Sequence, residues 1–240
     1  MRYKVITTFK PGDWDRYARR MVQSVIDRWP NVDLTVYYEG QGPYFDHQRV
    51  TWVDIDKANP KLHKFREHYK NDPVAMGKLD EIPGGVRRSA RLATEGGLDA
   101  KKESYLWNAV KFSHKVSCVT HAVKTYTDYD YVIWIDDDTY TLRDIPMQFI
   151  ESICPNNTLL EWHDSYVFWH LTKEYRQKHS AKVHDIGYSK GVKGHHVFVN
   201  SELGQYIDHF KGDRKDARSS KAEDIRKTPD MQKIDYWSKK

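Results

Sequence analysis

The sequence predicts an α/β protein whose sheet is mostly parallel and is flanked by helices. Three observations predict it: a strand, a helix and a second strand within the first forty residues, a third strand-like run soon after, and a short apolar run, Tyr131–Ile135, that ends in three acids. Strands that alternate with helices form βαβ units, whose strands lie parallel in one sheet. The chain has 240 residues, enough for one substantial core, and we expect a single domain over residues 1–240.

The first βαβ unit is predicted at the N-terminus. The run Tyr3–Phe9 is typical of a strand, and a turn at Pro11-Gly12 separates it from Trp14–Trp29, where apolar residues recur at helical spacing. Pro30 follows, and because a proline disfavours helical backbone at the residue before it, the helix is expected to end there. The run Asp33–Tyr38 is the second predicted strand.

A third strand and a long irregular segment come next. Residues Arg49–Ile55 are predicted as the strand. From Asp56 to Ser104 the periodicity fails, and prolines, Pro60 among them, and glycine pairs interrupt a polar stretch that is too long for an ordinary connection. Segments of this length inside a domain are usually lids, binding loops or disordered. We therefore expect residues 56–104 to be a lid or a substrate-binding insertion.

Regular structure is predicted again in the second half of the chain. Apolar residues within Tyr105–Thr125 indicate a helix that packs on the sheet and leads into the strand Tyr131–Ile135. A short helix is predicted around Met147–Ile153, and an aromatic, helix-like stretch runs from Glu161 to about Lys178. Residues 216–240 are polar, and we expect them to form a mobile tail.

Three consecutive acids, Asp136, Asp137 and Asp138, follow the apolar run directly. Alternate side chains of an extended chain point the same way, so Asp136 and Asp138 are predicted to converge on one cation while Asp137 faces elsewhere. Carboxylates at the carboxyl end of a buried strand lie where open α/β sheets bind ligands, and hard oxygen ligands suit Mg²⁺ or Mn²⁺. The alternative is an acidic turn that caps the following backbone. Because a cation relieves the repulsion among three carboxylates, we favour the metal site.

Composition and charge place the chain among globular proteins. It is 39% hydrophobic and 30% charged, which is not typical of membrane or disordered proteins. The formal net charge is +5, and the stretch from Lys57 to Lys102 holds eleven Lys and Arg against six Asp and Glu. This excess predicts an anionic partner, and an ordinary solvated surface is the alternative.

The N-terminus and the cysteines predict a location in the cytosol. The first residues enter a strand-like pattern without the apolar region of a secretory signal, so we expect a cytoplasmic protein. Cys118 and Cys154 have no metal-ligand spacing and are expected to be free thiols with no assigned role.

The acidic motif and its setting resemble metal-dependent glycosyltransferases of the GT-A type. In that family a Rossmann-like fold binds a nucleotide sugar, and an Asp-x-Asp motif, here Asp136 and Asp138, holds the divalent cation. The stretch His209-Phe-Lys-Gly212-Asp-Arg-Lys215 resembles a His-x-x-Gly-x-x-Lys signature of several such families. The resemblance implies that His209 is a metal ligand, that Lys215 contacts the diphosphate, and that Gly212 allows close approach of the backbone.

The resemblance also implies residues for the donor pocket and for catalysis. The segment Glu161-Trp-His-Asp164-Ser is similar to the region where inverting GT-A enzymes place a carboxylate beside the acceptor. Asp164 is the first candidate for this catalytic carboxylate and Glu161 is the second. The alternative role of Asp164 is to cap the following helix. Residues at the positions where the family contacts the base, the ribose and the diphosphate are Thr7, Thr8, Glu39, Lys111 and Lys115. For the two lysines, a solvated face of the helix is the alternative.

The function expected from this resemblance is transfer of a sugar from a nucleotide-diphosphate donor, UDP-linked by preference, with Mn²⁺ or Mg²⁺ as cofactor. The chain resembles small glycosyltransferases of phage and other viral genomes, and if it is viral we expect it in the host cytoplasm. The basic stretch favours hydroxymethylated pyrimidines of DNA as the acceptor, reached by base flipping. Alternatives are a glycan or protein acceptor, a metal-dependent nuclease or other phosphoryl-transfer enzyme, and a non-catalytic nucleic-acid-binding module.

Overall fold

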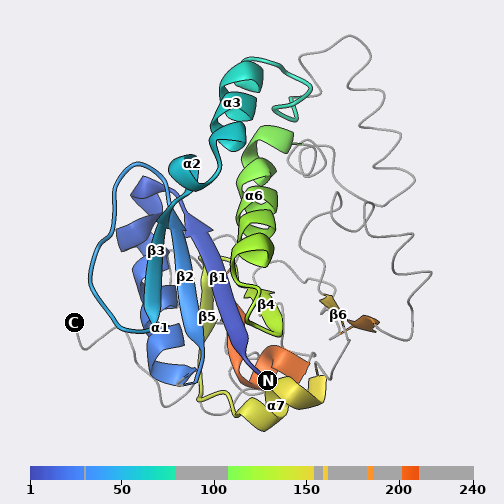
Figure 1. The fold of residues 1–240 in the computed structure, drawn as a ribbon. Coiled ribbons are helices and arrows are strands. Elements are labelled where there is room, and N and C mark those ends of the chain that lie inside the picture. Colours follow the sequence, from blue (N-terminus) through green and yellow to red (C-terminus); the bar gives the residue numbers. More distant parts are fainter. Residues whose placement is uncertain (30, 79–107, 154–158, 162–182, 186–201, 211–240) are drawn as a thin grey trace.

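A four-stranded parallel sheet with helices on both faces forms the body of the protein (Figure 1). The computed structural model describes residues 1–29, 31–78, 108–153, 159–161, 183–185 and 202–210. The sheet has the order β3-β2-β1-β4, so the chain builds outward from β1 in one direction and then crosses to its other side. The predicted mixed α/β class and the parallel sheet are confirmed.

The helices and strands have the following bounds. The sheet strands are β1 (Tyr3–Phe9), β2 (Asp33–Tyr38), β3 (Val50–Asp54) and β4 (Tyr131–Trp134). The helices are η1 (Pro11–Asp13), η2 (Trp14–Ala18), α1 (Arg19–Arg28), α2 (Ile55–Ala58), α3 (Pro60–Tyr69), α6 (Ala109–Thr125), α7 (Met147–Ile153) and η5 (Glu202–Gln205). Two further pairs are β5 (Thr139–Thr141) with β8 (Ile207–His209), antiparallel, and β6 (Leu159–Glu161) with β7 (Val183–Asp185), parallel.

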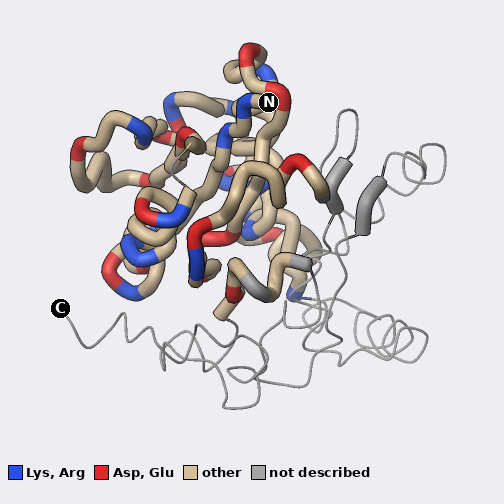
Figure 2. Tube along the Cα trace, turned by 90° about the horizontal axis from the view of Figure 1, so that it is seen from below, with Lys and Arg blue, Asp and Glu red and all other residues tan. Residues whose placement is uncertain are grey.

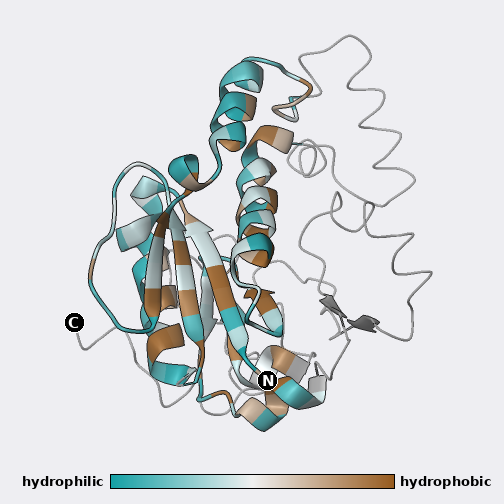
Figure 3. Ribbon diagram, viewed as in Figure 1, coloured by the Kyte–Doolittle hydropathy of each residue, from teal (hydrophilic) through white to brown (hydrophobic). Residues whose placement is uncertain are grey.

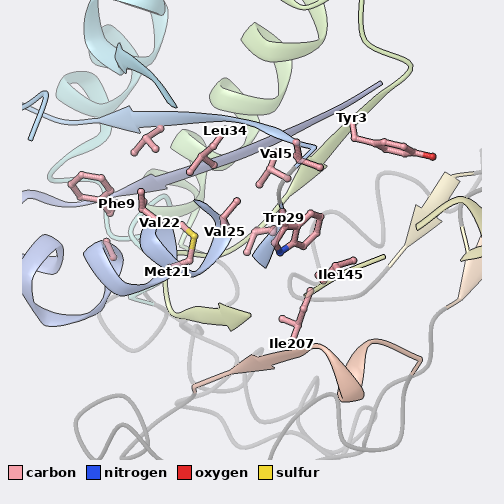
Figure 4. Close-up of a cluster of buried hydrophobic side chains, with 14 of the residues drawn as sticks. Tyr3, Val5, Phe9, Met21, Val22, Val25, Trp29, Leu34, Ile145 and Ile207 are labelled. Carbon is pink, nitrogen blue, oxygen red and sulfur yellow. The ribbon is translucent and has the colours of Figure 1, made fainter. Parts of the chain in front are cut away.

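The core lies on both faces of β1 and β2 because successive side chains of a strand point to opposite faces. On one face Val5 and Leu34 pack against Val22 of α1, within the cluster shown in Figure 4. On the other face Ile6 and Tyr37 pack against Cys118 and Ala122 of α6. The central strands are therefore buried along most of their length, with hydrophobic segments between paler and hydrophilic ones, whereas α3 is largely hydrophilic (Figure 3). Cys118 is a buried free thiol, as predicted, and Cys154 lies outside the described residues.

Several element boundaries differ from the predictions. The segment from Asp56 onward was expected to lack regular structure, but α2 and α3 occupy residues 55–58 and 60–69. The helix α2 begins because the Asp54 carboxylate accepts hydrogen bonds from the backbone N–H groups of Asp56 and Lys57, and this also ends β3 before Ile55. Pro60, interpreted as a breaker, is instead the first residue of α3, where its missing N–H costs nothing.

The predicted helices near the N-terminus and before the acidic motif are confirmed with altered starts. The first helical stretch begins at Pro11 as a 3₁₀ turn and passes through a π-helical turn before α1. The helix before β4 begins at Ala109, and the Asn108 side chain caps it by accepting from the N–H of Lys111 at 2.7 Å. Its expected first residues, 105–107, lie outside the described part of the chain.

Charged residues of both signs occur along the whole described chain. In the view of Figure 2, the Lys and Arg segments are interspersed with the Asp and Glu segments along the tube. The basic stretch between Lys57 and Lys102 is described as far as Lys78, which includes six of its eleven Lys and Arg; the rest of the expected anionic contact lies outside the described residues. Within the described ranges no helix combines the length and the apolar character needed to cross a membrane.

Candidate metal centre and ligand pocket

A pocket of about 200 Å³ opens at the carboxyl edge of the parallel sheet. The ends of β1, β2 and β4 meet at this edge because parallel strands all finish on the same side. Each end contributes polar side chains: Thr8 from β1, Glu39 after β2, and Asp136, Asp137 and Asp138 after β4. The helix α6 closes one side with Lys111, His114 and Lys115. The structure therefore brings these residues together at the carboxyl edge of the sheet, where the sequence predicted the site.

Asp136, Asp138 and His209 form a cluster whose ligand atoms all lie within 4.8 Å of one another. The Nε2 atom of His209 is 2.6 Å from Oδ1 of Asp138 and 3.6 Å from Oδ2 of Asp136. His209 and Asp138 are buried, and Asp136 is partly buried. Two carboxylates and one imidazole suit a divalent cation such as Mn²⁺ or Mg²⁺, which prefers oxygen ligands and accepts nitrogen. All three predicted ligands are thus in one place.

The pairing of β5 with β8 places His209 beside the acids. The polypeptide turns at the acidic motif, where the N–H of Thr139 donates to the carbonyl of Asp136 at 3.0 Å, and then enters β5. In the antiparallel register Thr139 lies opposite His209, and the N–H of Phe210 donates to the carbonyl of Asp138 at 3.0 Å. The motif is therefore a turn and not the extended strand end that we predicted, but Asp136 and Asp138 still converge.

The carboxylate of Asp136 is oriented by two neighbours on its other side. The indole N–H of Trp134 donates to Oδ1 of Asp136 at 2.6 Å, and Nζ of Lys115 lies 3.4 Å from the same oxygen. The Lys115 ammonium also lies 5.0 Å from the centre of the Trp134 ring. Because these contacts are made with Oδ1, it is Oδ2 that faces His209. Such outer partners orient a metal ligand and adjust its affinity.

Replacing Trp134 by phenylalanine is expected to weaken Mn²⁺ binding by about 10-fold, because the Asp136 carboxylate loses the donor that holds its orientation. An electron paramagnetic resonance titration of free Mn²⁺ measures the change. The matched control is Trp52→Phe, since the Trp52 Nε1 is buried without a hydrogen-bond partner among the described residues. Equal Mn²⁺ affinities of Trp134→Phe and the native chain would contradict an orienting role for Trp134.

Among the residues expected in a donor pocket, four line it and one does not. Thr8, Glu39, Lys111 and Lys115 are part of the pocket wall. Thr7 is completely buried in β1 and does not line it. The lysines one turn apart on α6 lie on the side that faces the acids, which gives the pocket both signs of charge. An anionic ligand group would find its cationic contacts there.

The remaining predicted site residues lie where the structure gives no side-chain placement. Asp164, Gly212 and Lys215 are outside the described residues. Glu161 is the last residue of β6, and only its backbone is described. The expected acceptor-side carboxylate and the expected diphosphate contact of Lys215 therefore stay predictions.

Several pocket residues were not singled out from the sequence. Tyr17, in the π-helical turn, lines the pocket near Asp137; burial raises the pKa of its phenol, and the charges of Asp137 and Asp13 act in the same direction. Its signal was the short distance along the chain between β1 and the first helix, since that connection closes over a nucleotide in α/β folds. His114 lies on the same face of α6 as Lys111 and Lys115, so helical spacing would have found it.

Glu39 has a defined partner in α3. Its Oε2 atom accepts from Nη2 of Arg66 at 2.9 Å, and both side chains are largely buried. His114 Nδ1 lies 3.8 Å from the other carboxylate oxygen, a distance that fits an ion pair. Burial nevertheless lowers the pKa of His114 to about 4, assisted by the positive charges of Arg66, Lys10 and Lys111. We conclude that His114 is neutral near pH 7 and that the true ion pair is Arg66–Glu39.

The whole chain, and not the site alone, is the basis for comparison with known proteins. Comparison with protein-family models, with curated proteins and with solved structures finds no match. The assignment of a function therefore depends on the residues at the carboxyl edge of the sheet and on their geometry.

Proposed function

We propose that the protein is a metal-dependent glycosyltransferase of the GT-A type that uses a nucleotide-diphosphate sugar, UDP-linked by preference. The observation that carries the proposal is the convergence of Asp136, Asp138 and His209 beside a pocket at the carboxyl edge of a parallel sheet. Two motifs indicated this class, Asp-x-Asp and the His-x-x-Gly-x-x-Lys signature. Asp138 and His209 are 71 residues apart in the chain but belong to the same cluster. If the three acids only formed a turn, nothing would favour a histidine beside Asp136 and Asp138.

The residues of the pocket suit the two ends of such a donor. Asp136, Asp138 and His209 would hold Mn²⁺ or Mg²⁺, which supplies positive charge to the departing diphosphate when bound. Lys111 and Lys115 of α6 would contact the phosphate oxygens beside the cation, because an ammonium group binds phosphate as a point charge. Thr8 and the region around Glu39 would receive the nucleoside at the ends of β1 and β2.

For the acceptor we propose a hydroxyl group, with hydroxymethylated pyrimidine in DNA as the first substrate to test. The support is the excess of Lys and Arg between Lys57 and Lys102. A glycan or protein hydroxyl is the alternative acceptor. Binding to hydroxymethylated DNA that weakens steeply with salt would favour the first, and weak binding that does not depend on salt would favour the second.

The donor is tested by a panel of nucleotide sugars with Mn²⁺. A UDP-sugar is expected to raise the melting temperature in the presence of Mn²⁺, and excess EDTA is expected to remove the effect. Turnover should release the nucleoside diphosphate and leave a DNA acceptor intact. Cleavage of DNA with release of nucleotides would instead identify a metal-dependent nuclease, since acid clusters with Lys and His serve that chemistry too. Turnover that persists in excess EDTA would reject the metal-dependent mechanism.

A further inference from the structure

Three elements that are distant in sequence bring an ion pair and a neutral imidazole together beside the pocket. Arg66 comes from α3, Glu39 from the end of β2, and His114 from α6. The Arg66 guanidinium holds Oε2 of Glu39 at 2.9 Å, which leaves Oε1 turned toward the imidazole. The carboxylate is thus fixed on one side before any ligand is present.

The two nitrogens of His114 have different surroundings. Nδ1 and the neighbouring Oε1 of Glu39 are both enclosed, 3.8 Å apart, and neither has a hydrogen-bond partner among the described residues. Nε2 is not enclosed, and no hydrogen bond to it is present in the described part of the chain. Since His114 lines the pocket, its accessible nitrogen is the one that a ligand can reach.

The carboxylate selects the tautomer of the imidazole. A negative oxygen facing Nδ1 favours the tautomer that carries the proton on Nδ1, although 3.8 Å is longer than a hydrogen bond. The lone pair is then on Nε2, which becomes a hydrogen-bond acceptor. Glu39 itself is not open to a ligand at Oε1, so its effect on a ligand passes through His114.

The charge state of the His114 imidazole determines whether the residue is suited to bind a ligand or to transfer a proton. Its pKa of about 4, lowered by burial and by nearby cations, keeps it neutral near pH 7. A base of that strength removes protons poorly from hydroxyl groups near neutral pH. The same neutral ring is a good acceptor of a hydrogen bond, and a buried donor of the ligand left without a partner is costly.

We propose that His114 is a nucleoside-recognition residue whose Nε2 accepts a hydrogen bond from an N–H or O–H group of the bound nucleotide, with Glu39 and Arg66 as positioning residues. This inference rests on the proposed function, because it assumes that a nucleotide occupies the pocket. The donor group belongs either to the base or to the ribose, and both present the same chemistry to the imidazole.

The test compares UDP analogues on the full chain in saturating Mn²⁺ by isothermal titration calorimetry. His114→Leu is expected to weaken UDP binding by about 10-fold, the value of one hydrogen bond to a buried partner. The probes are UDP, its N3-methyl analogue, and its 2′-deoxy and 3′-deoxy analogues. The analogue that lacks the donor should bind equally to the native chain and to His114→Leu. An N3-methyl probe with this behaviour identifies the base, and a deoxy probe identifies the ribose.

Two further variants separate recognition from loss of structure. His114→Gln, whose side-chain oxygen can replace Nε2 as acceptor, should retain most of the UDP affinity. His121→Leu removes the other imidazole near the middle of α6, which bonds the Tyr37 hydroxyl at 2.9 Å and does not line the pocket, so it should leave the UDP affinity near the native value. Glu39→Gln should weaken UDP binding less than His114→Leu, and the two effects should not add because both act through one hydrogen bond.

The outcomes distinguish this inference from the proposed function. If the native chain binds UDP and His114→Leu binds it equally well, or if that variant loses the same factor for all four probes, the recognition role of His114 is wrong while the donor site stands. If the native chain binds no nucleoside diphosphate in Mn²⁺, the proposed function fails and the inference fails with it.

Discussion

Asp138→Asn is expected to lower the affinity for Mn²⁺ by about 100-fold or more and to abolish turnover of the nucleotide-sugar donor, because a ligand is lost outright whereas changes in outer partners alone cost 10- to 100-fold. Asp138 is 6% exposed, and its Oδ1 is 2.6 Å from His209 Nε2. Asparagine keeps the size of the side chain but removes the negative charge that a divalent cation requires. A Mn²⁺ titration with donor hydrolysis in parallel measures both effects.

The neighbouring acid provides the control for Asp138→Asn. Asp137 follows Asp136 in the same turn and lines the pocket, but it does not belong to the three-residue cluster. Asp137→Asn changes the same formal charge, and we expect it to preserve most of the Mn²⁺ affinity. If the two variants bind Mn²⁺ equally, or if Asp138→Asn turns over the donor at the native rate, the cation is not held where we place it.

Trp29→Ala is expected to lower the free energy of unfolding by about 3–5 kcal/mol, the usual cost of deleting a large buried aromatic side chain. Trp29 is 3% exposed and packs in the core cluster between α1 and the sheet (Figure 4). Its indole N–H donates to Oγ1 of Thr141 at 2.9 Å, which ties the end of α1 to β5. The variant therefore loses both burial and the link to the strand that positions His209. Urea denaturation measures the change in free energy.

Two further substitutions are controls for Trp29→Ala. Trp29→Phe keeps most of the apolar volume and removes only the hydrogen bond, so a loss of about 1–2 kcal/mol is expected. Val74→Ala alters a side chain that is 53% exposed and should change the free energy of unfolding by less than about 0.5 kcal/mol. A loss below 1 kcal/mol for Trp29→Ala would show that α1 and β5 are not held together through this side chain.

The predicted strands agree with the structure where one local pattern decides them. β1 and β2 have the predicted bounds, and α7 covers the predicted Met147–Ile153. Their apolar residues are continuous or periodic over a few residues, and burial of those side chains is enough to select the element. The segment after β3 was misjudged because a capping aspartate and an N-terminal proline start short helices that have little periodicity to detect.

The sequence by itself predicted the parallel sheet, the acidic residues that follow β4, and Asp136 and Asp138 as metal ligands. These predictions depend on hydrophobic runs and adjacent charges, which are local properties of the chain. Only the tertiary structure decided that His209 shares their cluster and that Arg66, Glu39 and His114 meet beside the same pocket. The pairing of β5 with β8 and the packing of α3 beside α6 join segments far apart in the chain. Such contacts depend on the register and packing of the whole fold, and no local pattern encodes them.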